Sequence, residues 1–193
     1  AGTAMGGASD TSKIETLTRE LLLEIGENPE REGLRDTPRR VAESYKKMFA
    51  GYRQNLESIV TVFENEGYDE MVIAKDIEFY SICEHHILPF FGRVHIGYIP
   101  GDKIIGLSKL PRLVEVFARR LQNQERMTSQ IAEGLMSILQ PKGVGVVAEA
   151  QHLCMMARGV EKQHSVVTTS ALRGLFKKEL NTRGEFLRLI GKA

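Results

Sequence analysis

Apolar residues near the start of the chain recur at steps of three and four, the period of an α-helix with one apolar face. These residues are Ile14, Leu17, Leu21 and Ile25. The pattern predicts a helix from residue 10 that ends near Gly26 and Pro29. A second helix is predicted to start at Asp36, whose side chain can cap it, with Pro38 in the first turn, and to end at Gly51.

From residue 71 the pattern changes to the alternation typical of strands. Strands are predicted over residues 71–83, 93–99, 144–156 and 165–172, and helices over residues 108–121 and 127–139. Pro89 and Gly92 are expected to bracket a bend between the first two strands, and Ser108 to cap the first of these helices. The segment from Thr182 to Glu185 is a capping box that predicts a C-terminal helix.

This order of elements favours an α+β fold, in which an antiparallel sheet carries helices on one face. We expect residues 1–9, which are rich in Ala and Gly, to form a tail outside the fold. Residues 10–70 are interpreted as an N-terminal helical region, and residues 71–193 as the catalytic domain.

Composition narrows the class of protein. Of the 193 residues, 42% are hydrophobic and 26% are charged, as in ordinary globular domains. A net charge of +1 gives no basis for nucleic-acid binding. No apolar run approaches the roughly 20 residues that cross a bilayer, and no signal peptide is expected, so no membrane association is predicted. Two cysteines are too few for a disulfide framework and suit a reducing compartment, the cytoplasm.

The residues with metal-binding chemistry fall into two short segments. Cys83, His85 and His86 form the first, and His152 and Cys154 form the second. Neighbours in an extended segment point to opposite faces, so only one of His85 and His86 is expected to reach a shared ion. Cys83, His86 and Cys154 would form a zinc site with one open position, where the metal lowers the pKa of a water. His85 and His152 would flank it as proton donors and acceptors. Two alternatives stay open: thiols that merely fill the core, and a disulfide between Cys83 and Cys154.

Basic residues gather on and after the helix predicted from residue 108. They are Lys109, Arg112, Arg119, Arg120, Arg126 and Arg158. Such a set suits a polyphosphate, but it also suits a solvated helix face paired with Glu115 and Glu125. Glu125 can instead accept two N–H groups from a purine edge. Arg39 and Arg40, in the first turn of the second helix, are either solvated or part of an anion site.

Four segments together closely resemble the GTP cyclohydrolase I family. They are Ser81–His86, Gly106–Leu110, Gln124–Thr128 and His152–Gly159. The resemblance implies the tunnelling fold, an antiparallel four-stranded sheet with two helices on one face after an N-terminal helical region. It also implies that five subunits close into a barrel and that two rings stack into a decamer, with active sites between subunits. The implied reaction converts GTP and water to 7,8-dihydroneopterin triphosphate and formate, the first step toward tetrahydrofolate or tetrahydrobiopterin.

The resemblance also implies roles for individual residues. The zinc ligands fall on Cys83, His86 and Cys154, and the catalytic positions on His85, His152 and Ser108. The triphosphate-binding positions fall on Lys109, Arg112, Arg158 and, more loosely, Arg40, and the guanine-binding positions on Gln124 and Glu125. Leu121 departs from the family pattern, since some members carry proline there, but no assigned role depends on it.

Two competing functions remain from sequence. Related tunnelling-fold enzymes act on pterins or deazapurines, but one group holds zinc with three histidines and another uses a cysteine nucleophile without zinc. The paired cysteines argue against the first, and the adjacent His85 and His86 against the second. A zinc-stabilised scaffold is the other alternative, and it would need a fourth protein ligand.

Overall fold

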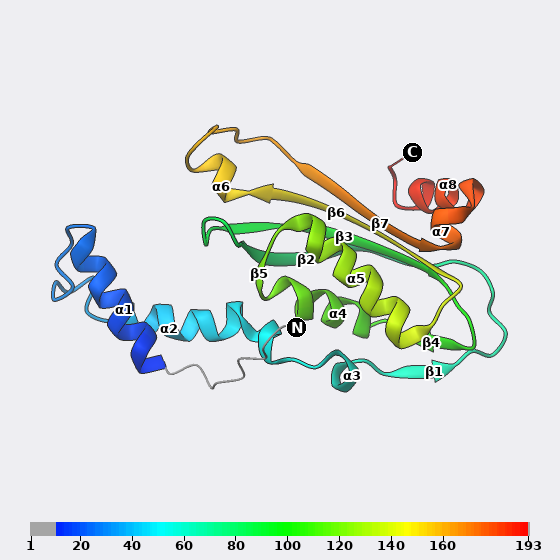
Figure 1. Ribbon diagram of the computed structural model, residues 1–193, viewed down its shortest axis with the longest axis horizontal. Coiled ribbons are helices and arrows are strands. Elements are labelled where there is room, and N and C mark those ends of the chain that lie inside the picture. Colours follow the sequence, from blue (N-terminus) through cyan, green and yellow to red (C-terminus); the bar gives the residue numbers. More distant parts are fainter. Residues whose placement is uncertain (1–10, 193) are drawn as a thin grey trace, which may run out of the picture.

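The structure is a computed structural model that describes residues 11–192 (Figure 1). The predicted tail, residues 1–9, lies outside the described residues. The elements are α1 (Thr11–Glu24), α2 (Thr37–Met48), the 3-10 helix η1 (Ala50–Arg53), α3 (Leu56–Ile59), β1 (Val62–Glu64), β2 (Val72–Cys83), β3 (Pro89–Ile99), β4 (Lys103–Ile105), α4 (Lys109–Ala118), β5 (Leu121–Gln122), α5 (Gln124–Leu139), β6 (Gly143–His152), α6 (Leu153–Met156), β7 (Val167–Gly174), α7 (Leu175–Lys178) and α8 (Leu180–Leu189).

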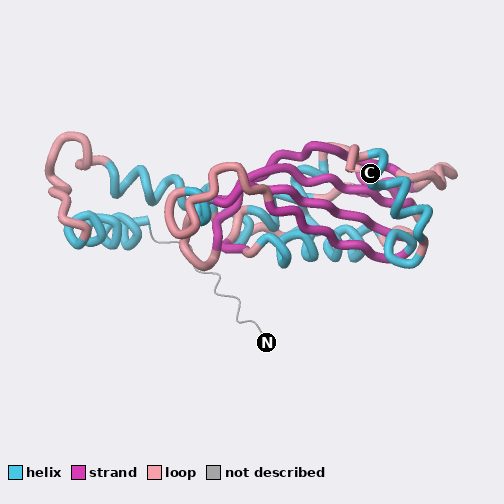
Figure 2. The backbone as a smooth tube through the Cα atoms, turned by 90° about the horizontal axis from the view of Figure 1, so that it is seen from above, coloured by secondary structure: helices cyan, strands magenta, loops and turns pink. Residues whose placement is uncertain are grey.

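A five-stranded sheet in the order β5-β2-β3-β6-β7 forms the centre of the molecule (Figure 2). The four long strands pair antiparallel, as predicted, which confirms the α+β class with an antiparallel sheet. The fifth strand is short and parallel to β2, and the sequence prediction missed it. It occupies the end of the helix predicted over residues 108–121, because α4 stops at Ala118 and the chain then turns to pair with β2.

Helices α4 and α5 cover one face of this sheet. Alternate strand residues such as Val94, Ile96 and Tyr98 are buried there against Leu113 of α4 and Leu135 of α5. Each such fully buried aliphatic side chain stabilises the fold by about 1.5–3 kcal/mol. This layer holds the ends of the strands in fixed positions, which is what a site at the strand ends requires.

The C-terminal helices cover part of the opposite face of the sheet. Phe176 of α7 and Phe186 of α8 are fully buried and pack edge to face, with ring centroids 5.3 Å apart. They press on Gly145 of β6, where an added Cβ would lie 2.5 Å from Cδ1 of Phe176. The capping box prediction is wrong in position, because α8 begins at Leu180 and Thr182 lies inside it.

Two further predictions about strand limits are wrong. No bend separates the first two strands at Gly92, because β3 runs without interruption from Pro89. The strand predicted over residues 144–156 ends at His152, and one helical turn, α6, follows. That turn changes the direction of the chain and decides where Cys154 points.

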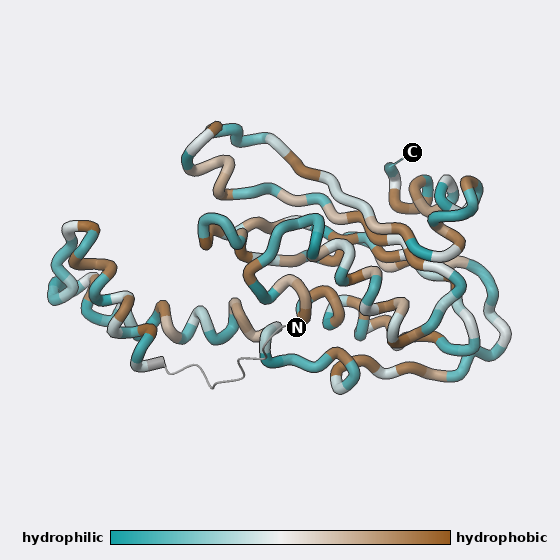
Figure 3. The backbone as a smooth tube through the Cα atoms, in the orientation of Figure 1, coloured by the Kyte–Doolittle hydropathy of each residue, from teal (hydrophilic) through white to brown (hydrophobic). Residues whose placement is uncertain are grey.

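Helices α1 and α2 form an arm that extends away from the sheet (Figure 1). Apolar residues recur along α1 (Figure 3). The predicted stripe is largely exposed, because Leu21 is 58% accessible and Ile25, just after the helix, is 65% accessible. Asp36 precedes α2 as predicted but makes no side-chain capping bond. The region over residues 10–70 is not wholly helical, since β1 pairs with β4 in a separate two-stranded sheet.

Candidate metal centre

The first half of the site is the turn that follows β2. Cys83 is the last residue of the strand and is only 6% exposed. Its backbone N–H donates to the carbonyl of Leu88 at 2.8 Å, and its carbonyl accepts from Ile87 N–H at 2.9 Å. Ile87 adopts a φ of 54°, a left-handed conformation that an isoleucine takes only under constraint. The turn therefore folds back tightly on Cys83 and presents His85 and His86.

The second half of the site is α6. Strand register brings it to the turn, because Phe90 at the start of β3 pairs with His152 at the end of β6. Cys154 follows in the helical turn and is 8% exposed. Segments far apart in sequence thus meet at one end of the sheet.

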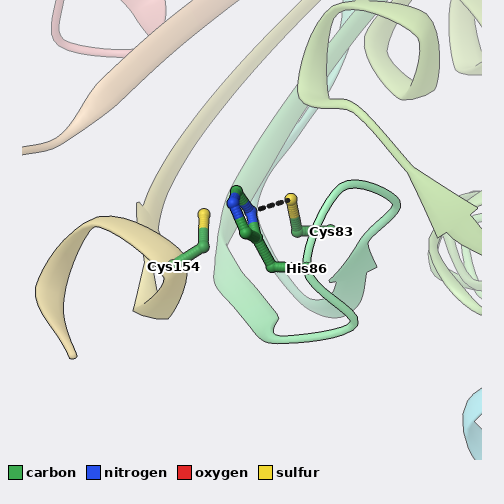
Figure 4. Close-up of side chains that lie close together, drawn as sticks. All are labelled: Cys83, His86 and Cys154. Atoms are coloured by element: carbon green, nitrogen blue, oxygen red, sulfur yellow. Dashed lines mark hydrogen bonds between the residues drawn. The ribbon is translucent and has the colours of Figure 1, made fainter. Parts of the chain in front are cut away.

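Cys83, His86 and Cys154 converge as the sequence predicted (Figure 4). Their ligand atoms all lie within 4.8 Å of one another, and Cys83 Sγ lies 3.8 Å from His86 Nδ1. Both cysteines are free thiols, so the disulfide alternative is not the state seen here. Among residues 11–192 no fourth His, Cys, Asp or Glu joins this group. Three protein ligands are the number typical of catalytic zinc sites, whereas structural sites use four.

The protonation of Cys154 depends on whether a metal ion is bound. Burial, followed by the neighbouring Cys83 thiol, raises the pKa of Cys154 above its ordinary value. A bound cation reverses this effect, because a coordinating thiol is deprotonated outright. The Cys₂His donor set matches the preference of Zn²⁺ for sulfur and imidazole ligands.

His85 lies beside the cluster but is not part of it. Its Nδ1 lies 3.9 Å from Cys83 Sγ, and only His86 joins the two thiols, as expected, although not for the reason given. The alternation argument fails because His85 and His86 sit in a turn, not in an extended strand. The side chain of His85 is 66% exposed and can meet a substrate.

His152 lies on the buried side of the site. Its ring stacks on Phe90 with centroids 4.6 Å apart and an interplanar angle of 1°. Its Nε2 lies 2.8 Å from Oε1 of Gln124, the first residue of α5. Burial lowers the pKa of His152, and the nearby Glu125 carboxylate partly opposes this, so the neutral imidazole is favoured.

Glu84 and Arg126 have a role that the sequence analysis missed. The Arg126 guanidinium forms a two-pronged ion pair with the Glu84 carboxylate, and Asn123 Nδ2 donates to Glu84 Oε1 at 3.1 Å. The hydrogen bond from Arg126 lowers the pKa of Glu84. Asn123 also caps α5 by accepting from Arg126 N–H. The clamp ties the Cys83–His86 turn to the start of α5. The sequence indicates this ion pair only weakly: Glu84 is an acid between the candidate ligands Cys83 and His86, and its partner Arg126 is distant in sequence.

Arg158 also reaches the cluster. Its Nη1 donates to the Cys154 carbonyl at 3.0 Å and lies 3.3 Å from His86 Nε2. Of the candidate triphosphate ligands, this is the one that the structure places beside the metal ligands.

The remaining candidates lie elsewhere in the chain. Ser108, Lys109 and Arg112 are at the start of α4, while its other end adjoins β5 and Cys83. Ten residues of helix correspond to about 15 Å. Within residues 11–192 no side-chain hydrogen bond or ion pair joins these three residues to the cluster, and Ser108 does not cap α4 through its side chain. Arg40 on α2 is 3.4 Å from Asp36.

Comparison with known proteins identifies the family. The sequence profile described as GTP cyclohydrolase I matches residues 14–191, which include both segments of the metal cluster. The chain belongs to the GTP cyclohydrolase I family.

Named GTP cyclohydrolase 1 proteins are similar over nearly the whole chain. The protein of Wolinella succinogenes is 61% identical over 175 residues, which cover 90% of this chain and 94% of the relative. That of Methylococcus capsulatus is 56% identical over 183 residues, with 94% and 98% covered. That of Chlorobaculum tepidum is 60% identical over 173 residues, with 89% and 77% covered. The chain is therefore an enzyme of the GTP cyclohydrolase I family.

One solved structure, the archaeosine synthase QueF-Like in the apo form, aligns over 54% of this chain and 93% of its own. Sequence identity is 18% and the TM-score is 0.44, a likeness too low to identify the fold. No helix within residues 11–192 is long and apolar enough to cross a membrane.

Proposed function

We propose that the protein converts GTP and water to 7,8-dihydroneopterin triphosphate and formate, with one zinc ion held by Cys83, His86 and Cys154. One observation carries the proposal: these three ligand atoms meet within 4.8 Å in a chain of the GTP cyclohydrolase I family. The product would enter the synthesis of tetrahydrofolate or tetrahydrobiopterin. We propose a reducing compartment, the cytoplasm, because the two cysteines are assigned to the metal instead of to a disulfide.

Hydrolysis at C8 of guanine needs an activated water and a proton for the imidazole ring. Zinc held by Cys83, His86 and Cys154 would activate a water by lowering its pKa. We assign the proton to His85, because its exposed ring lies next to the metal ligands without completing their set. His152 serves the later proton transfers, for which a neutral imidazole with a lowered pKa is suited.

The start of α5 is assigned to the guanine base. Glu125 is exposed there, and a carboxylate accepts two parallel N–H bonds from a purine edge. Glu125 directly follows Gln124, whose Oε1 lies 2.8 Å from His152 Nε2. The resemblance places Gln124 at the same edge, although its side chain is 2% exposed and lies behind His152.

The triphosphate is assigned to Arg158 together with Lys109 and Arg112, and Arg40 is a further candidate. Ser108 is assigned to the ribose rearrangement that precedes ring closure. The separation of the α4 residues from the chain's own cluster supports a site completed by a neighbouring subunit.

Free sheet edges support the same arrangement. Within the described chain, β7 has no strand on its far side, and β5 covers β2 only at Ile82 and Cys83. Such edges are templates for pairing with another chain. We therefore propose a homo-oligomer, a decamer of two stacked pentamers whose sheets close into the barrels of the tunnelling fold.

The test measures product and metal together. Purified protein is incubated with GTP, formate is quantified, and the pterin is detected by fluorescence after oxidation. We expect about one zinc per chain and formate release that stops when the metal is chelated, while GTP binding largely persists. Cys154→Ala is expected to lose the metal and the turnover together. Zinc-replete protein that binds GTP but releases no formate would refute the proposal.

A further inference from the structure

Gln124 lies between His152 and the β6–β7 pair, and its amide is held at both ends. The carbonyl oxygen Oε1 lies 2.8 Å from His152 Nε2. The nitrogen Nε2 donates to the carbonyls of Ala148 at 3.1 Å and Val167 at 2.9 Å. Because a backbone carbonyl can only accept, the amide nitrogen must face the strands. The oxygen must then face His152.

A second set of hydrogen bonds fixes the same orientation independently. Thr128 Oγ1 donates to the backbone carbonyl of Gln124 at 2.7 Å, so it must accept from Thr169 Oγ1, which is 2.7 Å away. Thr169 Oγ1 has then spent its hydrogen and can only accept from Gln124 Nε2, at 3.1 Å, so the two amide hydrogens are shared among three acceptors. Only one assignment of donors and acceptors satisfies all of these hydrogen bonds. The network is also buried, since Gln124 is 2% and Thr128 1% exposed.

The consequence reaches His152. An amide oxygen can only accept, so the hydrogen of the neutral imidazole must be on Nε2, and Nδ1 carries the lone pair. Phe90 holds the plane of the ring by stacking on it, but stacking alone permits a half-turn of the ring that exchanges the positions of its atoms. Gln124 selects one of these two orientations. No residue among 11–192 donates a hydrogen bond to Nδ1 of His152 or accepts one from it.

We propose that Gln124 is a positioning residue, which sets the orientation and tautomer of His152 so that Nδ1 is the nitrogen that exchanges a proton with the substrate. The inference rests on the proposed function for His152 as the proton-transfer group. In this proposal the Gln124 side chain positions His152 and does not bind guanine. The exposed Glu125 stays the candidate ligand of the guanine edge.

The main test is Gln124→Met, which keeps the bulk of the side chain but removes its amide. With zinc content unchanged, kcat for pterin formation should fall about 10- to 100-fold, part of the roughly 10²–10⁴-fold that a placed proton-transfer group supplies. KM for GTP should change by less than about twofold, because transition-state assistance is lost and ground-state binding is kept. Glu125→Gln, on the same helical turn, is the matched contrast and should raise KM. A Gln124→Met variant that raises KM while kcat holds would overturn the proposal in favour of guanine binding.

Two further measurements exclude a general structural effect. On a His152→Ala background, Gln124→Met should cause no further loss of kcat, since residues that act as a unit are not additive. Additive losses would contradict a role through His152. Solid-state ¹⁵N NMR of histidine-labelled protein, with His152→Ala to assign the signal, should show one tautomer with hydrogen on Nε2, and a mixture in Gln124→Met.

The NMR result does not depend on turnover. Wild-type protein that shows this tautomer but releases no formate would remove the proposed function and leave the positioning of His152 intact. A hydrogen on Nδ1 in the wild type would overturn the positioning itself. If Gln124→Met does not fold, Gln124→Asn keeps a buried amide and withdraws its oxygen from His152, with the same expected fall in kcat.

Discussion

Helices α7 and α8 form a C-terminal cap over β6. Substituting alanine for glycine should have opposite effects at Gly145 of β6 and Gly184 of α8. At Gly145 the new Cβ would lie 2.5 Å from Cδ1 and 2.9 Å from Cε1 of Phe176, and 2.9 Å from Cε1 of Phe186. All three distances are below the contact distance of two carbons, and both rings are fully buried and unable to move freely. Overpacking of this kind costs about 1–3 kcal/mol of the free energy of unfolding.

Gly184 provides the matched control within α8. Its Cβ would meet only Nη1 of Arg188, at 3.4 Å, and its φ is not positive. Alanine in a helix interior is favoured over glycine by up to about 1 kcal/mol, so Gly184→Ala should be neutral or stabilising.

Thermal melting at fixed protein concentration measures both changes. For a chain of this length about 1 kcal/mol corresponds to about 2–4 °C, so Gly145→Ala should lower Tm by roughly 4–8 °C for a cost near 2 kcal/mol. Zinc content should be unchanged, because the cap covers the sheet away from the metal ligands. A Gly145→Ala protein as stable as the wild type would show that the helices do not pack on β6 as described.

Three other predictions concern the site and its surroundings. His85→Ala should keep the zinc and reduce formate release at least about 100-fold, the loss of a proton-transfer group; metal analysis and a formate assay check this, and loss of zinc would show that the ligand choice is wrong. Burial raises the pKa of Tyr98, so its neutral form is favoured in the folded state and its contribution to stability is lost as pH rises above about 10. Between pH 9 and pH 11 the denaturant midpoint should therefore fall more in the wild type than in Tyr98→Phe. An equal fall in both proteins would contradict this. Glu84→Gln removes the charge that Arg126 clamps, so zinc affinity measured by chelator competition should fall severalfold, whereas Glu78→Gln, an exposed acid on the preceding strand β2, should leave it unchanged.

Sequence patterns predicted the long elements, whose apolar residues follow a clear period or, in β6, a continuous run. The four long strands and helices α1, α2, α4 and α5 begin within a few residues of their predicted positions, apart from β3, which starts earlier than expected. The predictions failed at element ends. Leu121 belongs to a strand, because its pairing with β2 outweighs local helix preference. Leu153–Met156 form a helical turn where a continuing strand was predicted.

The candidate site divides in the same way. The residue types that can bind zinc, and the spacing that lets Cys83 and His86 share an ion, are properties of a few adjacent residues. The arrival of Cys154 depends on the pairing of Phe90 with His152, a contact between strands far apart in sequence. Gln124 and Glu84 show the limit most clearly, because one amide and one carboxylate have partners that no local pattern indicates.

The sequence by itself determined the periodic elements, the chemistry of the ligands and the family. Only the tertiary structure decided how distant segments meet at one end of the sheet, that Glu84 pairs with Arg126, and that Gln124 turns inward to His152. The physical reason is that periodicity and ligand chemistry are local, whereas register and burial are set by the packing of the whole core.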